Sequence, residues 1–166
     1  MRTKNFRLRR GSGTLELILA LPVLFFVTLA IFQFGFLMVI QQTVTTAAID
    51  GVRAAAKEIT AGDASTAAIS AVNDTLAVHG LAVDPTSTDI SSDTKLAVEY
   101  GGTPTITTGD PGLSCSTPSS PAVGPTEVRI SVCVDLTTAP LLNALTSFGF
   151  DLSGRRFEIS SMATIE

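Results

Sequence analysis

The sequence predicts an α+β protein. We expect a long N-terminal transmembrane helix that continues into an amphipathic stalk, followed by a small exported domain with helices packed on an antiparallel sheet. Three observations predict this. An uncharged run of thirty-three residues separates Glu16 from Asp50, helical periodicity continues beyond it, and period-two alternation appears in the C-terminal part. A chain of 166 residues has room for one small domain and an anchor.

The charge distribution predicts the orientation of the anchor. The first ten residues contain five basic groups and no acid, whereas Gly51 to Glu166 contains six basic and thirteen acidic residues. Basic flanks remain on the cytoplasmic side of a membrane. We therefore expect residues 1–11 to form a basic cytoplasmic leader and the rest of the chain beyond the span to be exported. The net charge of -4 and the lack of a basic face with aromatic residues argue against a nucleic-acid partner.

The apolar run from Leu17 to Ile40 is long enough to cross a bilayer. Its 24 residues would form a helix of roughly 36 Å, and a hydrocarbon core is about 30 Å thick. A cleaved secretory signal has an apolar region of only about 7–15 residues that ends in small residues. Here bulky Phe32 and Phe34 stand near the far end. The sequence thus predicts a single-pass inner-membrane protein with the lipid bilayer as a partner, and a bend at Pro22.

Helical periodicity continues past the span. Apolar residues recur at spacings of three and four and form one stripe: Val44, Ala48, Val52, Ala55 and Ile59. Gly62 is a suitable stop, so we expect one helix and stalk over residues 12–61. Asp63 is a suitable N-cap for a second helix that ends near Gly80. Residues 62–166 then form the exported domain.

The pattern changes to period two in the distal part, which predicts half-buried strands. The alternating apolar residues are Leu96, Val98 and Tyr100, then Val128, Ile130, Val132 and Val134, and finally Phe157, Ile159, Ala163 and Ile165. A short helix is expected over residues 140–149, with Pro140 in its first turn and Gly149 after its end.

Residues 102–126 are different, because nineteen of the twenty-five are Gly, Pro, Ser or Thr. This composition predicts a loop. It contains Cys115, and Cys133 lies on the polar face of the strand that follows. Two cysteines in an exported domain favour one disulfide, which would contribute about 3 kcal/mol. The alternative is two unpaired thiols, and two cysteines alone are weak evidence for a metal site.

Other chemical motifs are scarce. His79 is the single histidine, so the sequence offers no His-rich metal site. No nucleophile stands with a base, and we expect no enzyme activity, no catalytic residue, no metal and no cofactor. Asn73-Asp74-Thr75 matches a glycosylation acceptor, but it falls inside a predicted helix.

The stretch "LRRGSGTLELIL" places a carboxylate, that of Glu16, directly before the apolar run. Basic residues precede Gly11, and Glu16 is the fifth residue after it. This arrangement resembles the class III signal of type IV pilins and pseudopilins. The resemblance implies that a prepilin-type peptidase cuts between Gly11 and Ser12 on the cytoplasmic side and leaves the span in place. The alternative is that Glu16 is an interfacial carboxylate without a role.

Two longer segments narrow this resemblance. "LELILALPVLFFVTLAIFQFG" resembles the opening of TadE-like proteins, pseudopilin-type components of the tight-adherence (Flp) pilus system, and "AAIDGVRAAA" resembles the family's segment just after the membrane. The likeness covers about residues 11–56. Leu17 stands where the family usually has an aromatic residue, and Gln33 stands where it has an acid.

The resemblance implies a minor pseudopilin or assembly factor for an adhesive pilus or secretion system. Its partners would be other pseudopilins and pilus-assembly membrane proteins, and helix association would involve Glu16, Pro22 and Gly35. Two alternatives remain open at this point: a membrane-anchored exported binding domain unrelated to pili, and an exported hydrolase.

Overall fold

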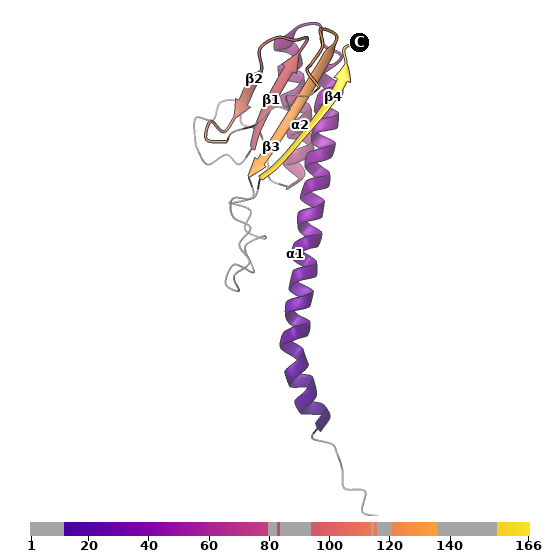
Figure 1. Cartoon of the computed structure of the whole chain (residues 1–166), viewed down its shortest axis with the longest axis vertical. Coiled ribbons are helices and arrows are strands. Elements are labelled where there is room, and N and C mark those ends of the chain that lie inside the picture. Colours follow the sequence, from indigo (N-terminus) through magenta and orange to yellow (C-terminus); the bar gives the residue numbers. More distant parts are fainter. Residues whose placement is uncertain (1–11, 80–82, 84–93, 114, 116–120, 136–155) are drawn as a thin grey trace, which may run out of the picture. The chain divides into compact units, whose positions relative to one another are not determined.

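The computed structural model describes residues 12–79, 83, 94–113, 115, 121–135 and 156–166. The helices are α1 (Ser12–Ala55), α2 (Ala61–Leu76) and a short 3-10 turn, η1 (Ala77–His79). The strands are β1 (Thr94–Tyr100), β2 (Ile106–Gly109), β3 (Glu127–Asp135) and β4 (Arg156–Thr164) (Figure 1). This confirms the α+β class. The expected leader (1–11) and the helix expected over 140–149 lie outside the described residues.

The strands form one antiparallel sheet in the order β2-β1-β3-β4. Strand β3 pairs with β1 from Thr94↔Val134 to Tyr100↔Val128, and with β4 over its whole length. The three strands that the alternating pattern predicts are therefore the central pair and one edge. Strand β2, at the other edge, lies inside the segment that composition predicts to be a loop.

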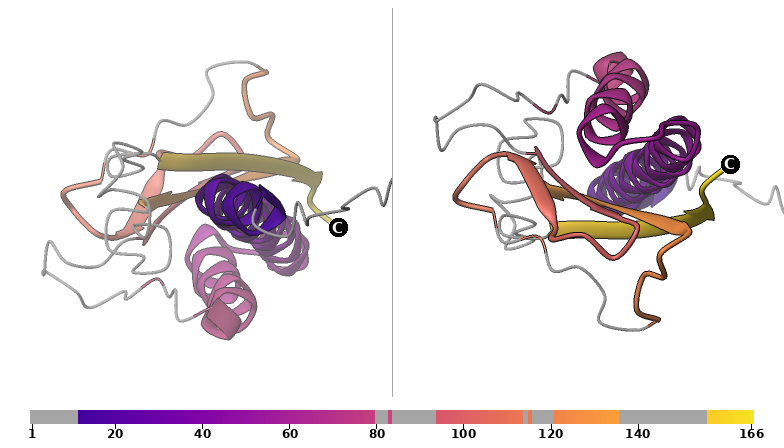
Figure 2. Two further views of the ribbon diagram at one scale, coloured as in Figure 1. Left: turned by 90° about the horizontal axis from the view of Figure 1, so that it is seen from below. Right: turned by 90° about the horizontal axis from the view of Figure 1, so that it is seen from above.

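The chain divides into two compact units, one ending at Phe36 and the other comprising Leu37–Glu166. The boundary falls within α1. In the second unit, the C-terminal part of α1 and the whole of α2 lie on the same face of the sheet (Figure 2). We call this second unit the head.

The core of the head lies between these helices and the sheet. Small side chains on both helices allow a close approach to the strands, which contribute larger branched residues. The fully buried members are Val44, Ala47, Ala48 and Ala55 of α1, Ala64, Ala68, Val72 and Leu76 of α2, and Leu96, Val128, Ile130, Val132 and Val134 of the sheet. The stripe predicted on the outer half of α1 is thus the face that packs on the sheet, apart from Ile59.

The first helix ends earlier than expected, at Ala55 instead of Ala61. Groups from distant parts of the chain take the carbonyls that follow: the N–H of Glu166 donates to the carbonyl of Ala56 at 3.0 Å, and the Tyr100 hydroxyl donates to that of Glu58 at 2.5 Å. These contacts replace the bonds of another helical turn. Ile59, left outside the helix, is 90% exposed.

The second helix is capped by Thr60, not by Asp63 as expected. The Thr60 hydroxyl oxygen accepts a hydrogen bond from the backbone N–H of Asp63 at 3.2 Å, and the hydroxyl donates to the Asp63 carboxylate at 2.7 Å. The acid adds a favourable charge at the helix N-terminus. Gly62 is the second residue of this helix and does not stop the preceding one.

On the face of the sheet away from the helices, described residues of the segment that follows β2 lie against β1 and β3, whereas Arg156, Glu158 and Ser160 of β4 are exposed. Lys95 Nζ donates to the carbonyl of Leu113 at 2.6 Å, and the buried guanidinium of Arg129 donates to the carbonyl of Pro121. The N–H of Gly124 donates to the Glu127 carboxylate at 2.8 Å. These bonds, together with the disulfide described below, fix described parts of residues 110–125 against β1 and β3.

Candidate functional site

The predicted processing segment begins the described part of the chain. Gly11 lies outside the described residues, and Ser12 is the first residue of α1. Glu16 is the fifth residue of the helix, and its side chain is exposed. No contact of Glu16 with another described residue fixes its carboxylate.

The apolar half of α1 is exposed along its length. Most of its large side chains are between 40% exposed, at Phe26, and 73% exposed, at Phe32, while Leu29 and Phe36 are half-buried. None of the residues in its most apolar stretch is buried in the described structure. An apolar surface of this length is unfavourable in water and marks a contact with lipid or protein. By length and composition, this one helix can cross a membrane, and it is compatible with single-pass anchoring.

The three residues expected to take part in helix association do not share one face. At about 100° per residue, Pro22 and Gly35 each lie roughly 100–120° around α1 from Glu16. The helix continues through Pro22, and a Cβ added to Gly35 would meet no atom within 4 Å. The surface of the helix is therefore accessible at Gly35, where no side chain covers the backbone. A role for all three in association requires more than one neighbouring helix.

The segment "AAIDGVRAAA" has a clear packing function. Ala47 and Ala48 are fully buried, and a Cβ on Gly51 would lie 2.7 Å from Val72 Cγ2 of α2 and 3.5 Å from Ile130 Cδ1 of β3. These distances leave no room for a side chain at this crossing. The segment positions the sheet and α2 on the helix that carries the exposed apolar run.

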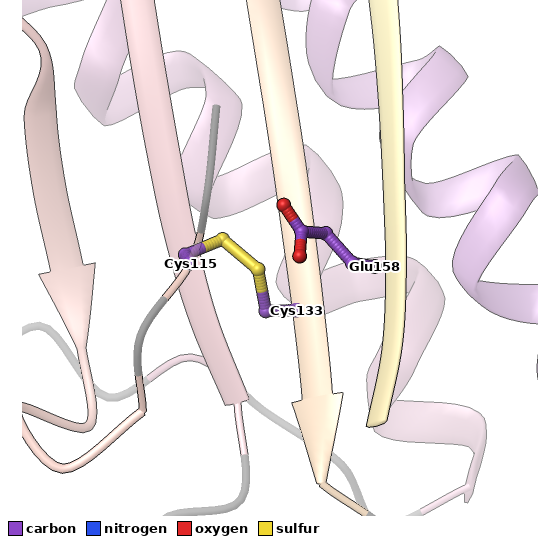
Figure 3. A group of neighbouring side chains, drawn as sticks. All are labelled: Cys115, Cys133 and Glu158. Atoms are coloured by element: carbon purple, nitrogen blue, oxygen red, sulfur yellow. A yellow bond between two sulfur atoms is a disulfide. The ribbon is translucent and has the colours of Figure 1, made fainter. Parts of the chain in front are cut away.

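Cys115 and Cys133 form a disulfide with Cα atoms 5.7 Å apart. It joins the loop segment to the central strand β3. Glu158 is opposite Cys133 on β4, and its side chain extends toward the disulfide on the same side of the sheet (Figure 3). One ligand atom from each of the three residues lies within 4.8 Å of the others. Because both sulfur atoms are bonded to each other, the group lacks the thiolates that a metal site would need.

Sequence reasoning missed two polar interactions with structural roles, the ion pair of Arg129 with Glu99 and the hydrogen bonds of Asn73. Arg129 is buried and pairs with Glu99 at 3.1 Å. Asn73 exchanges two hydrogen bonds with the backbone of Val83, with its Nδ2 donating at 3.0 Å and its Oδ1 accepting at 2.6 Å. The Asn73 amide, which matches a glycosylation acceptor, is thus engaged inside the head. The period-two pattern places Arg129 on the polar face of β3, but it does not indicate that a loop covers that face.

Two features define the class of protein: an α+β head, and an apolar, exposed first half of α1 that is compatible with a membrane anchor. Within this class, residues 11–53 match the sequence model of the TadE-like protein family. The match confirms the resemblance over this segment. It ends within α1, before α2 and the sheet. No curated protein sequence and no solved structure matches the chain.

Proposed function

We propose that this chain is a minor pseudopilin or assembly factor of a tight-adherence pilus or secretion system. In this proposal α1 anchors it in the inner membrane, with its N-terminus in the cytoplasm and its head exported. The observation that carries the proposal is the family match over residues 11–53, which begins at the expected cleavage glycine and includes Glu16, the apolar run and Gly51. The role is non-enzymatic.

Cleavage after Gly11 would allow Ser12 and Glu16 to take part in helix association. It would create an α-amino group on Ser12, which is mostly charged at neutral pH. Glu16 of a packed neighbouring helix would offer the opposite charge. Two unit charges 4 Å apart at an effective dielectric of about 20 attract by roughly 4 kcal/mol, and desolvation offsets part of this gain. Such a pair would favour association and fix the relative depth of the helices.

The cleavage step is tested by mass spectrometry of the mature N-terminus after coexpression with a prepilin-type peptidase. The wild-type chain should begin at Ser12, and Gly11→Leu should leave a full-length, membrane-inserted form. A reporter active only in the periplasm, fused after Glu166, should be active. A wild-type chain that keeps its leader in the presence of the peptidase would reduce the proposal to a plain membrane anchor.

The association step is tested by crosslinking within the membrane. Glu16→Ala should insert with the same topology and lose its crosslinks to other pseudopilin helices, because the carboxylate is removed and no contact with another described residue is lost. Glu58→Gln is a matched control, since it removes an acid from the head and should leave crosslinking unchanged. Equal crosslinking and equal pilus assembly for wild type and Glu16→Ala would show that Glu16 is only an interfacial charge.

A further inference from the structure

The head begins where the apolar run ends. Ile40, the last residue of that run, is 3% exposed because it already lies in the core of the head. The chain therefore has no spacer between the segment that can cross a bilayer and the folded head. Chain connectivity alone therefore keeps the surface of the head around Ile40 close to the end of the membrane span.

The surface next to this point is formed by the C-terminal end of α2. A shallow groove of about 250 Å³ lies between the helices and is lined by Val39, Gln42, Thr43 and Thr46 of α1 and by Thr75 and Val78 from the end of α2 and η1. The two helices are joined by a short turn, so they run in opposite directions. With sixteen residues in α2, the turn at Ile59 lies roughly 24 Å further from the groove along the helix axis.

The side chains around the groove suit a membrane interface. Val78 is 79% exposed, Met38 is 60% exposed and Val39 is 43% exposed, and they stand beside uncharged Gln and Thr residues. The hydroxyls of Thr43 and Thr46 donate to helix carbonyls four residues earlier, so their protons are already satisfied. This combination of exposed apolar groups with satisfied or uncharged polar groups lowers the cost of leaving bulk water.

We propose that this surface, made by Met38, Val39, Val78 and the groove between α1 and α2, rests on the bilayer that α1 spans. The inference rests on the proposed anchoring by α1. Met38 and Val39 belong to the end of the apolar run, and Val78 with the groove adds a contact with lipid beyond that run. Val78 lies at the boundary between headgroups and acyl chains, where interfacial apolar side chains are buried by about 5–10 Å. Asp74, exposed one helical turn earlier, remains among the hydrated headgroups and limits the depth.

The observations favour lipid over a protein partner because the surface includes residues that directly follow the exposed apolar helix in sequence, and because it holds few apolar side chains. A specific protein interface needs a larger buried area with packed anchors. A lipid surface needs only shallow insertion next to an existing anchor. The contact would restrict the swing of the head about the end of the span, which gives every copy in the membrane a similar presentation of its sheet.

The chain has no tryptophan, so single substitutions provide site-specific fluorescent probes. Full-length Val78→Trp, Ile59→Trp and Phe25→Trp proteins are each reconstituted into phosphatidylcholine vesicles with and without brominated acyl chains. Val78→Trp should lose emission in the brominated vesicles and emit further to the blue. Ile59→Trp, at a position that is 90% exposed just before the N-terminus of α2, should be quenched by aqueous iodide and not by bromine. Phe25→Trp reports on the span itself and should be quenched by bromine.

The three probes separate the possible failures. If Phe25→Trp is quenched and Val78→Trp behaves like Ile59→Trp, the contact of the head with lipid is refuted and the anchor stands. A blue-shifted Val78→Trp that bromine does not quench would mean that protein covers the surface, which also refutes the lipid contact. Loss of quenching at Phe25→Trp would overturn both the anchor and the inference that depends on it.

Discussion

Gly51 provides the most direct test of how the head is assembled on α1. An alanine Cβ at this position would lie 2.7 Å from Val72 Cγ2 and 3.5 Å from Ile130 Cδ1. Carbon atoms in favourable contact are about 3.5–4.0 Å apart. Val72 is 0% exposed, so its side chain cannot give way by turning into solvent. In Gly51→Ala, α2 or Val72 must therefore shift by on the order of 1 Å.

Two opposing terms determine the size of the effect. Overpacking of a filled core costs about 1–3 kcal/mol. Replacing glycine by alanine inside a helix recovers about 0.5–1 kcal/mol of backbone entropy. We expect Gly51→Ala to lower the free energy of unfolding by about 0.5–2 kcal/mol, because the steric term outweighs the propensity term. Gly51→Leu places three more carbon atoms in the same space and should cost about 3 kcal/mol or more.

The assay is urea unfolding of the full chain in detergent micelles, followed by the emission of Tyr100. This residue is the only tyrosine in a chain without tryptophan, it is 8% exposed, and it contacts the turn after α1. Gly62→Ala is the matched control, since its Cβ would meet no atom nearer than Thr60 Oγ1 at 4.0 Å. It should be neutral or stabilising by up to about 1 kcal/mol. If Gly51→Ala stabilises the head as much as Gly62→Ala does, the close approach of α1 and α2 is refuted.

Two further predictions concern the covered face and the end of α2. Cys133→Ser should lower the free energy of unfolding by about 3 kcal/mol. Hydrogen exchange should show that the amides of Gly112 and Leu113 exchange faster than in wild type, with a much smaller change in β1. Equal protection in mutant and wild type would contradict the prediction that the disulfide holds this segment on the sheet. Asn73→Ala should cost about 1–3 kcal/mol in urea unfolding, because it leaves the buried backbone groups of Val83 unpaired. An effect no larger than that of Asp74→Ala, its exposed neighbour, would contradict this role.

Much of the fold could be predicted because periodicity records which face of an element is buried. Strands β1, β3 and β4 follow from alternation, and α2 follows from small residues at helical spacing. Strand β2 was missed because Ile106 is its only strongly apolar residue and glycine ends it at Gly109, as suits a short edge strand. The β-branched run "TITT" was the available indication, and the surrounding glycine and proline obscured it.

Helix ends were harder to predict, because contacts distant in sequence determine them. The end of α1 depends on the Tyr100 hydroxyl and the C-terminal backbone, which local sequence does not place near Ala55. The ion pair between Arg129 and Glu99 was hard to predict for the same reason. Arg129 looks like a solvent-exposed residue by alternation, and only the segment that crosses β3 explains its burial against Glu99. Local patterns show which elements form, and tertiary contacts decide where they stop.

The candidate site contains residues that pack within the chain and residues that are exposed, although both lie in one continuous helix, α1. Gly51 meets side chains of α2 and β3, so its requirement for small size is satisfied entirely within the chain. Glu16 is exposed on a helix whose apolar neighbours are mostly exposed, and no contact with another described residue requires its carboxylate. Substitution at Gly51 should therefore change unfolding in micelles and leave peptidase cleavage intact. Substitution at Glu16 should change association and leave Tyr100-detected unfolding of the head unaltered. A Glu16 variant that destabilised the head would contradict this separation, because no described contact connects the two.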